Sequence, residues 1–204
     1  MRQALVTGLL FLLFTGCAPG VSLYTAEYEA SLSEVRRPAD AEQRYGAKEV
    51  TETDSSYTFE DEFVKSTWVP AAGVFYVDIE NKTGNSIQID WNQGAYVGPD
   101  GNSQRLIHGD VRRYQANESL PPTVIPAGGS VSKTIGSMEA FEGELFPVSY
   151  RNVGTDTSGA ASFRERVDAY EETEVQVLLP LKIEEEVNEY TFTFDVTDAR
   201  VNKE

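Results

Sequence analysis

The sequence predicts an all-β fold: an antiparallel β-sandwich of about seven or eight strands. Two observations predict it. Apolar and polar residues alternate over several short segments, and turns rich in Pro, Gly and Asn separate them. The clearest alternation places Tyr190, Phe192, Phe194 and Val196 on one face of a strand. A sheet with one apolar face must cover it, so a second sheet is expected.

Two strands at 75–79 and 87–91 alternate in the same way, and the Asn- and Gly-containing segment 81–85 between them predicts a β-hairpin. Residues 99–102 predict a second reversal, because Pro fixes one φ and Gly relieves another. The remaining expected elements are strands at 59–68, 94–97, 104–108, 131–135 and 174–181, and a helix at 162–171.

The 204 residues suit one domain, expected at 57–198 and followed by a tail at 199–204. Residues 17–56 are polar, without lasting apolar periodicity, and are interpreted as a tether. A short helix at 26–35 is possible there, because Tyr28, Leu32 and Val35 recur at helical spacing.

The first 16 residues have the layout of an export signal. Arg2 supplies the cationic start, and an uncharged apolar run follows from Ala4 to Phe14. A run of this length crosses only about half of a ~30 Å hydrocarbon core, so it is interpreted as a removable signal peptide.

The chain has one cysteine, Cys17, and the segment Leu13–Cys17 resembles the bacterial lipobox, although Phe14 stands where Leu, Val or Ile is usual. The resemblance implies cleavage between Gly16 and Cys17, with diacylglycerol and an N-acyl chain on Cys17. The alternative is cleavage elsewhere, for instance after Ala18. Several acyl chains make a durable anchor in a lipid bilayer. In lipoproteins of this kind, an Asp directly after the cysteine favours retention at the inner membrane. This chain has Ala18 at that position, so the outer membrane or cell surface is expected.

The chain carries a net charge of −16, and loss of Arg2 with the leader makes it −17. Such a chain is expected to repel nucleic acid and anionic membranes. With Cys17 acylated, no disulfide can form, so burial and hydrogen bonding must stabilise the domain.

Several of these segments together resemble bacterial lipoproteins with an immunoglobulin-like domain. The resemblance covers most of residues 57–198 and implies a fold and a cell-envelope setting, with no catalytic residues. The segments that carry it are 75–83, 87–91, 96–101, 125–126, 179–181 and 190–194.

Catalytic motifs are scarce in the sequence. The only histidine, His108, has no Gly-x-Ser-x-Gly motif beside it, so a surface or capping role is favoured over a catalytic triad. Zinc sites need several Cys and His ligands, which this chain lacks. The many carboxylates leave a glycosidase pair open, but nothing selects two of them.

Calcium is the better metal candidate because it accepts oxygen ligands in flexible geometry. Its candidate ligands lie near predicted turns: Asp78, Glu80, Asp100 and Asn102. Turn formation alone is the favoured role for these residues. Trp68 is the candidate for stacking on a sugar, whereas Trp91 is in phase with the apolar face of its strand and is expected in the core.

These observations favour a membrane-anchored, non-catalytic envelope lipoprotein that acts as an interaction or structural module, with an envelope protein as its partner. The alternative is a lipoprotein that binds Ca²⁺, a glycan or a small molecule. An envelope hydrolase is the third hypothesis.

Overall fold

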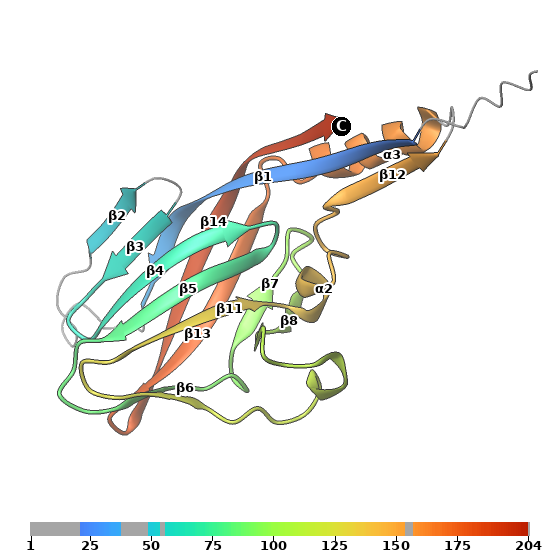
Figure 1. Ribbon diagram of the computed structural model, residues 1–204. Coiled ribbons are helices and arrows are strands. Elements are labelled where there is room, and N and C mark those ends of the chain that lie inside the picture. The colour runs from blue at the N-terminus through green and yellow to red at the C-terminus, as the bar shows by residue number, and fades with distance from the viewer. Residues whose placement is uncertain (1–20, 38–48, 54–55, 154–156, 204) are drawn as a thin grey trace, which may run out of the picture.

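The computed structural model describes residues 21–37, 49–53, 56–153 and 157–203. In this part of the chain, the strands form two antiparallel sheets that pack together, which confirms the predicted β-sandwich (Figure 1). Fourteen strands are present among the described residues, more than the seven or eight expected. None of the helices described is long and apolar enough to cross a membrane.

The larger sheet, sheet A, contains eight strands. The path across it runs β10 (Thr123–Ile125), β6 (Ile87–Ile89), β13 (Glu174–Ile183), β14 (Glu186–Lys203), β1 (Val21–Arg36) and β12 (Ser149–Val153). Off this path, β7 (Ala95–Val97) pairs with β13 and also with β8 (Ser103–Arg105). The β7–β8 pairing confirms the predicted reversal at 99–102.

Sheet B contains six strands, in the order β2 (Glu49–Thr53), β3 (Ser56–Glu60), β4 (Val64–Ala71), β5 (Val74–Asn81), β11 (Ser130–Gly136) and β9 (Ile107–His108). The strand expected at 59–68 is thus two strands, because buried Asp61 makes a turn between them by accepting hydrogen bonds from the N–H groups of Phe63 and Val64. The helices are η1 (Arg113–Gln115), α2 (Met138–Phe141) and α3 (Thr157–Asp168).

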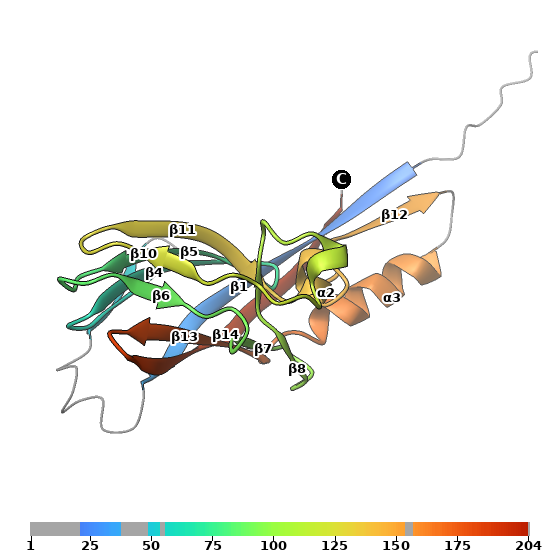
Figure 2. The same ribbon diagram turned by 90° about the horizontal axis from the view of Figure 1, so that it is seen from below.

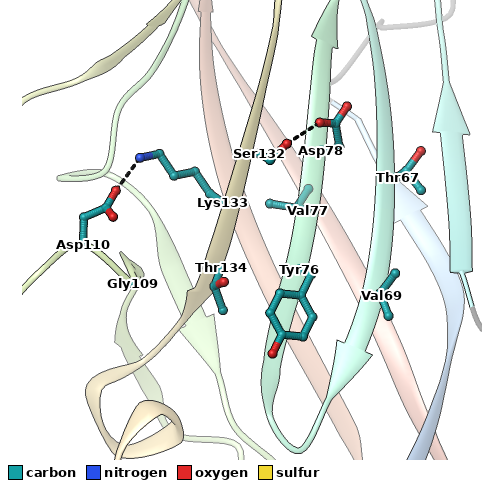
Figure 3. A pocket seen from close by; sticks show the side chains of 10 residues that line it. All are labelled: Thr67, Val69, Tyr76, Val77, Asp78, Gly109, Asp110, Ser132, Lys133 and Thr134. Carbon is teal, nitrogen blue, oxygen red and sulfur yellow. Dashed lines mark hydrogen bonds and ion pairs between the residues drawn. The ribbon is translucent and has the colours of Figure 1, made fainter.

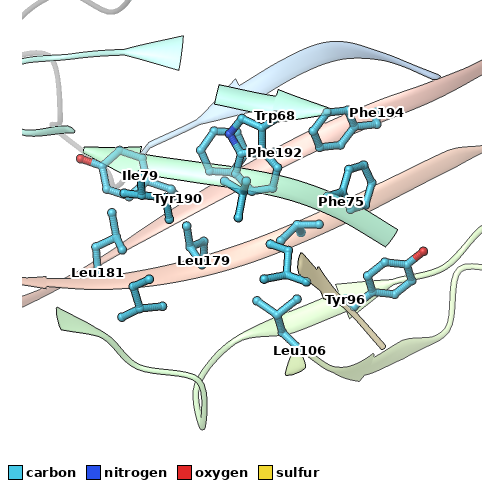
Figure 4. Packing of buried hydrophobic residues seen from close by; sticks show 14 of the residues in the cluster. Trp68, Phe75, Ile79, Tyr96, Leu106, Leu179, Leu181, Tyr190, Phe192 and Phe194 are labelled. Atoms are coloured by element: carbon cyan, nitrogen blue, oxygen red, sulfur yellow. The ribbon is translucent and has the colours of Figure 1, made fainter. Parts of the chain in front are cut away.

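Aromatic side chains from both sheets fill the core of the sandwich (Figure 4). The rings of Trp68 and Phe192 have centroids 4.2 Å apart, and those of Phe75 and Phe194 are 4.4 Å apart. Each pair joins sheet B to sheet A. The alternation of β5 and β14 therefore places their apolar faces against each other, as the sequence predicts.

The predicted hairpin between 75–79 and 87–91 is wrong, because β5 belongs to sheet B and β6 to sheet A. Buried Asn81 organises the crossing. Its amide nitrogen donates to the carbonyl oxygens of Asn85, Ile125 and Pro126, and its amide oxygen accepts from the N–H and hydroxyl of Thr83. These bonds satisfy backbone groups at the point where the chain leaves one sheet for the other.

The expectation of a tether with a short helix is also wrong for 21–36, which form β1 and pair along β14. The register shifts between Glu29 and Ala30 and again between Leu32 and Glu34. Each irregularity changes the phase of the alternation, so the apolar residues do not keep period two and imitate helical spacing. The expectation is wrong for residues 49–53 as well, because they form β2 and pair with β3. Most of the other residues of 17–56 lie outside the described residues.

One end of the molecule, here called the arm, projects beyond the sandwich (Figures 1 and 2). It consists of β12, α3, residues 21–28 of β1 and residues 199–203 of β14. The expected tail at 199–204 is thus wrong for 199–203, which continue β14. The predicted helix at 162–171 is present as α3, and it packs on the sheet through Ala160, Phe163 and Val167.

Candidate functional site

A groove of ≈ 600 Å³ lies on sheet B, on the side opposite the core (Figure 3). Period two puts Tyr76 and Asp78 on this outer face because their neighbours Phe75, Val77 and Ile79 are buried in the core. The groove is lined by Thr67, Val69, Tyr76, Val77, Asp78, Gly109, Asp110, Ser132, Lys133 and Thr134.

Cross-strand pairing arranges the outer side chains in two rows. The first row is polar, because Asp78 pairs with Thr67 on one side and Ser132 on the other. The Ser132 hydroxyl donates to Asp78 Oδ2 at 2.7 Å. A carboxylate and two hydroxyl side chains therefore lie side by side on the groove.

The second row is less polar, because Tyr76 pairs with Val69 and Thr134. Tyr76 is 54% exposed and Val69 is 39% exposed. A second hollow of ≈ 410 Å³ also contains Tyr76 and Thr134 in its lining. Its other lining residues are mostly apolar: Ala71, Ala72, Val74, Gly109, Ala140, Phe141, Glu142, Gly143 and Val148. The two hollows thus share Tyr76, with polar groups on one side and apolar groups on the other.

The polar end of the groove holds an ion pair between Lys133 Nζ and Asp110 Oδ2 at 2.5 Å. Lys133 lowers the pKa of the Asp110 carboxyl below its usual range. His108 Nδ1 lies 3.3 Å from the same oxygen, and the His108 ring packs 4.9 Å from that of Trp91. Burial, and then the Lys133 charge, lower the pKa of His108, while Asp110 opposes them. His108 is therefore favoured in its neutral form.

His108 has no hydrogen bond at Nδ1 among the described residues, so no serine hydroxyl is bonded to that atom. Its side chain is only 12% exposed. It is thus a mostly buried residue at the end of β9 rather than a surface or capping residue.

The general acid of a glycosidase needs a raised pKa. In three carboxyl groups, those of Glu60, Asp100 and Asp110, hydrogen bonds lower the pKa instead.

The four candidate calcium ligands lie on two different sheets. Asp78 and Glu80 are exposed on β5 in sheet B, whereas Asp100 and Asn102 form the β7–β8 turn beside sheet A. Asp100 accepts hydrogen bonds from the backbone and side-chain nitrogens of Asn102, which explains its lowered pKa. Within the described ranges, no three His, Cys, Asp or Glu residues gather as a metal site would require.

Trp68 does not offer a surface for stacking, which corrects the expectation. It is 0% exposed, and its indole nitrogen donates to the Ser66 hydroxyl at 2.9 Å. On β4, Trp68 is two residues after Ser66 and four after Val64, and all three are buried. This alternation at the start of the strand is the sequence pattern that could have predicted a core position for Trp68. Trp91 is in the core as predicted, and its indole nitrogen donates to Thr123.

Gly16 and Cys17 lie outside the described residues. The exposed aromatic residue of the groove is Tyr76, which alternation places on the outer face of its strand. Its neighbours from β4 and β11 depend on strand pairing, which the sequence does not reveal.

No protein-family model matches the chain, and neither a curated protein nor a solved structure matches it.

Proposed function

We propose that this chain is a membrane-anchored, non-catalytic envelope lipoprotein whose β-sandwich binds a partner protein through the groove on sheet B. The lipobox-like segment Leu13–Cys17 supports the anchor, with diacylglycerol and an N-acyl chain on Cys17. Ala18 supports the outer membrane or cell surface as the location. The bilayer and one envelope protein are then its partners.

The observation that carries this proposal is the exposed apolar row on the outer face of sheet B. An outer face that only meets water carries polar residues. Here Tyr76 and Val69 are exposed beside the apolar hollow that contains Phe141 and Val148. Partly apolar surfaces with a central tyrosine are typical of protein interfaces. A partner that fits this groove presents an apolar surface to Tyr76 and Val69 and hydrogen-bonding groups to Asp78.

Photocrosslinking in intact cells tests this proposal. A photoreactive amino acid replaces Tyr76 in the groove or, as control, Tyr114, which lies in η1 and is 69% exposed. Position 76 is expected to give one discrete adduct that weakens when Cys17→Ser releases the protein from the membrane. Equal adducts from both positions, or none from position 76, would contradict the proposal.

A second candidate is a lipoprotein that binds a glycan in the same groove. The exposed Tyr76 ring stands next to a row with a carboxylate and two hydroxyl groups, and aromatic stacking combined with such hydrogen bonds suits a sugar. A thermal-shift screen with envelope glycans and millimolar Ca²⁺ separates the candidates. Stabilisation that Tyr76→Ala removes and Tyr114→Ala keeps would favour the glycan. No shift with any compound would reject this version.

A further inference from the structure

The arm differs in charge from the rest of the molecule. It contains three acidic residues, Glu27, Glu165 and Asp168, in a chain whose net charge is −16. Its basic residues number five: Arg151, Arg164, Arg166, Arg200 and Lys203. The arm is therefore a cationic end of a strongly anionic protein.

Most of this positive charge is uncompensated. Arg200 forms ion pairs with Glu27, Glu29 and Asp198. Within residues 21–37, 49–53, 56–153 and 157–203, no carboxylate forms a salt bridge with the other four cations of the arm. Four guanidinium or ammonium groups are thus available to an anionic partner.

Two of these cations gather around Tyr24. Arg164 Cζ lies 5.4 Å from the centroid of the Tyr24 ring, and Lys203 Nζ lies 5.8 Å from it. Arg151 is on β12 and pairs with Leu23, the residue before Tyr24, so its side chain lies on the other face of the sheet at the same end of the arm. The buried Tyr24 ring therefore holds Arg164 and Lys203 together at this end of the sheet.

The cationic end is also where the chain emerges toward Cys17. Val21 begins β1 at the end of the arm, paired with Val153 of β12 (Figure 2). Val21 is four positions after Cys17, and an extended chain of four residue steps spans at most about 14 Å. Lipids on Cys17 would thus keep the arm close to the headgroups, within about two Debye lengths.

We infer that the arm docks on anionic lipid headgroups of the bilayer that holds the anchor, and so sets the orientation of the domain. The inference rests on the proposed anchoring through Cys17. Arg151, Arg164 and Lys203 contact the headgroups, while the acidic sandwich is repelled and stands away from the surface. The groove on sheet B, which lies outside the arm, then stays accessible to a partner from the aqueous side.

Lysine acylation on vesicles tests this inference. All contacts described above lie within residues 21–203, so the chain 17–204 keeps them. Its only cysteine is coupled to a maleimide lipid in vesicles. One set of vesicles is made of phosphatidylcholine alone, and the other also contains the anionic lipid phosphatidylglycerol. Mass spectrometry then follows the acylation of Lys203 and of Lys182. Lys182, which lies in the β13–β14 hairpin outside the arm and is 40% exposed, is the internal control.

Lys203 is expected to be labelled severalfold more slowly on the anionic vesicles, with Lys182 unchanged. The pair Arg151→Gln and Arg164→Gln should remove most of this protection, whereas Arg112→Gln and Arg113→Gln outside the arm should not. About 1 M NaCl, where the Debye length is near 3 Å, should remove it without any mutation.

Equal labelling of Lys203 on both vesicles, or equal protection of Lys182, would overturn the inference. The coupling is chemical, so this outcome is independent of whether a cell acylates Cys17. Failure of the docking and failure of the proposed anchor are therefore read from separate experiments.

Discussion

The sandwich and the arm are built from the same two long strands but are stabilised differently. In the sandwich, β1 and β14 lie in a sheet whose inner face is covered by sheet B, with a core of large aromatic side chains. In the arm, one short helix covers one face of the same sheet. The separate core there consists of Tyr24, Ala160, Phe163, Val167 and Ala199.

This difference shows that hydrogen bonding between two strands can continue beyond the large hydrophobic core into a region with only a small one. Apolar burial contributes roughly in proportion to area, so the small arm core stabilises much less than the sandwich core. The arm is expected to open locally while the sandwich stays folded. The proposed groove is on the stable region, and the proposed lipid contact is on the less stable one.

Trp68→Ala should have the largest effect, since it removes the ring that joins the two sheets. Core Trp→Ala changes cost about 3–5 kcal/mol. Urea unfolding followed by near-ultraviolet circular dichroism measures the loss. Tyr114→Ala, at an exposed site, is the control, and an equal loss there would contradict the assignment of Trp68 to the core.

Phe163→Ala should destabilise the arm alone. The ring is fully buried between α3 and β12, stacked on Tyr150, and its removal should cost roughly 3 kcal/mol. Hydrogen exchange should show faster exchange in α3 and β12 with unchanged exchange in β5 and β13. A uniform loss of protection would mean that the arm and the sandwich unfold as one unit.

Asn81→Ala should destabilise the sandwich by about 1–3 kcal/mol, because the carbonyl group of buried Ile125 loses its donor, as does the carbonyl group of Pro126. Thermal unfolding measures the change. Asn85→Ala is the matched control, since Asn85 is exposed and contributes only backbone atoms to this network. A stable Asn81→Ala protein would show that the crossing between sheets forms without this side chain.

His108 should give the smallest effect, visible as pH dependence. Its pKa is lowered in the folded state, so the unfolded chain binds the proton more readily. Stability is therefore full above the unfolded pKa, near 6.5, and falls as the pH drops through the folded pKa. Unfolding of wild type and His108→Gln at pH 7.5 and 5 measures this. An identical pH dependence in both would contradict it.

Alternation predicted most strands and the core position of Trp91, because burial of one sheet face leaves a local pattern. It did not predict which strands pair. The crossing at Asn81 depends on carbonyl groups more than forty residues away, at Ile125 and Pro126. It also failed for β1, where bulges broke the period near Glu29. The groove required the pairing of Asp78 with Ser132, which no local pattern contains.

The anchor at Cys17 is tested most directly by metabolic labelling with a palmitate analogue in cells that express wild type or Cys17→Ser, followed by membrane fractionation. Wild type is expected to carry the label and to sediment with membranes, since its acyl chains bury many methylene groups. Cys17→Ser should lose both label and membrane association. An unlabelled wild-type protein would contradict the proposed anchor.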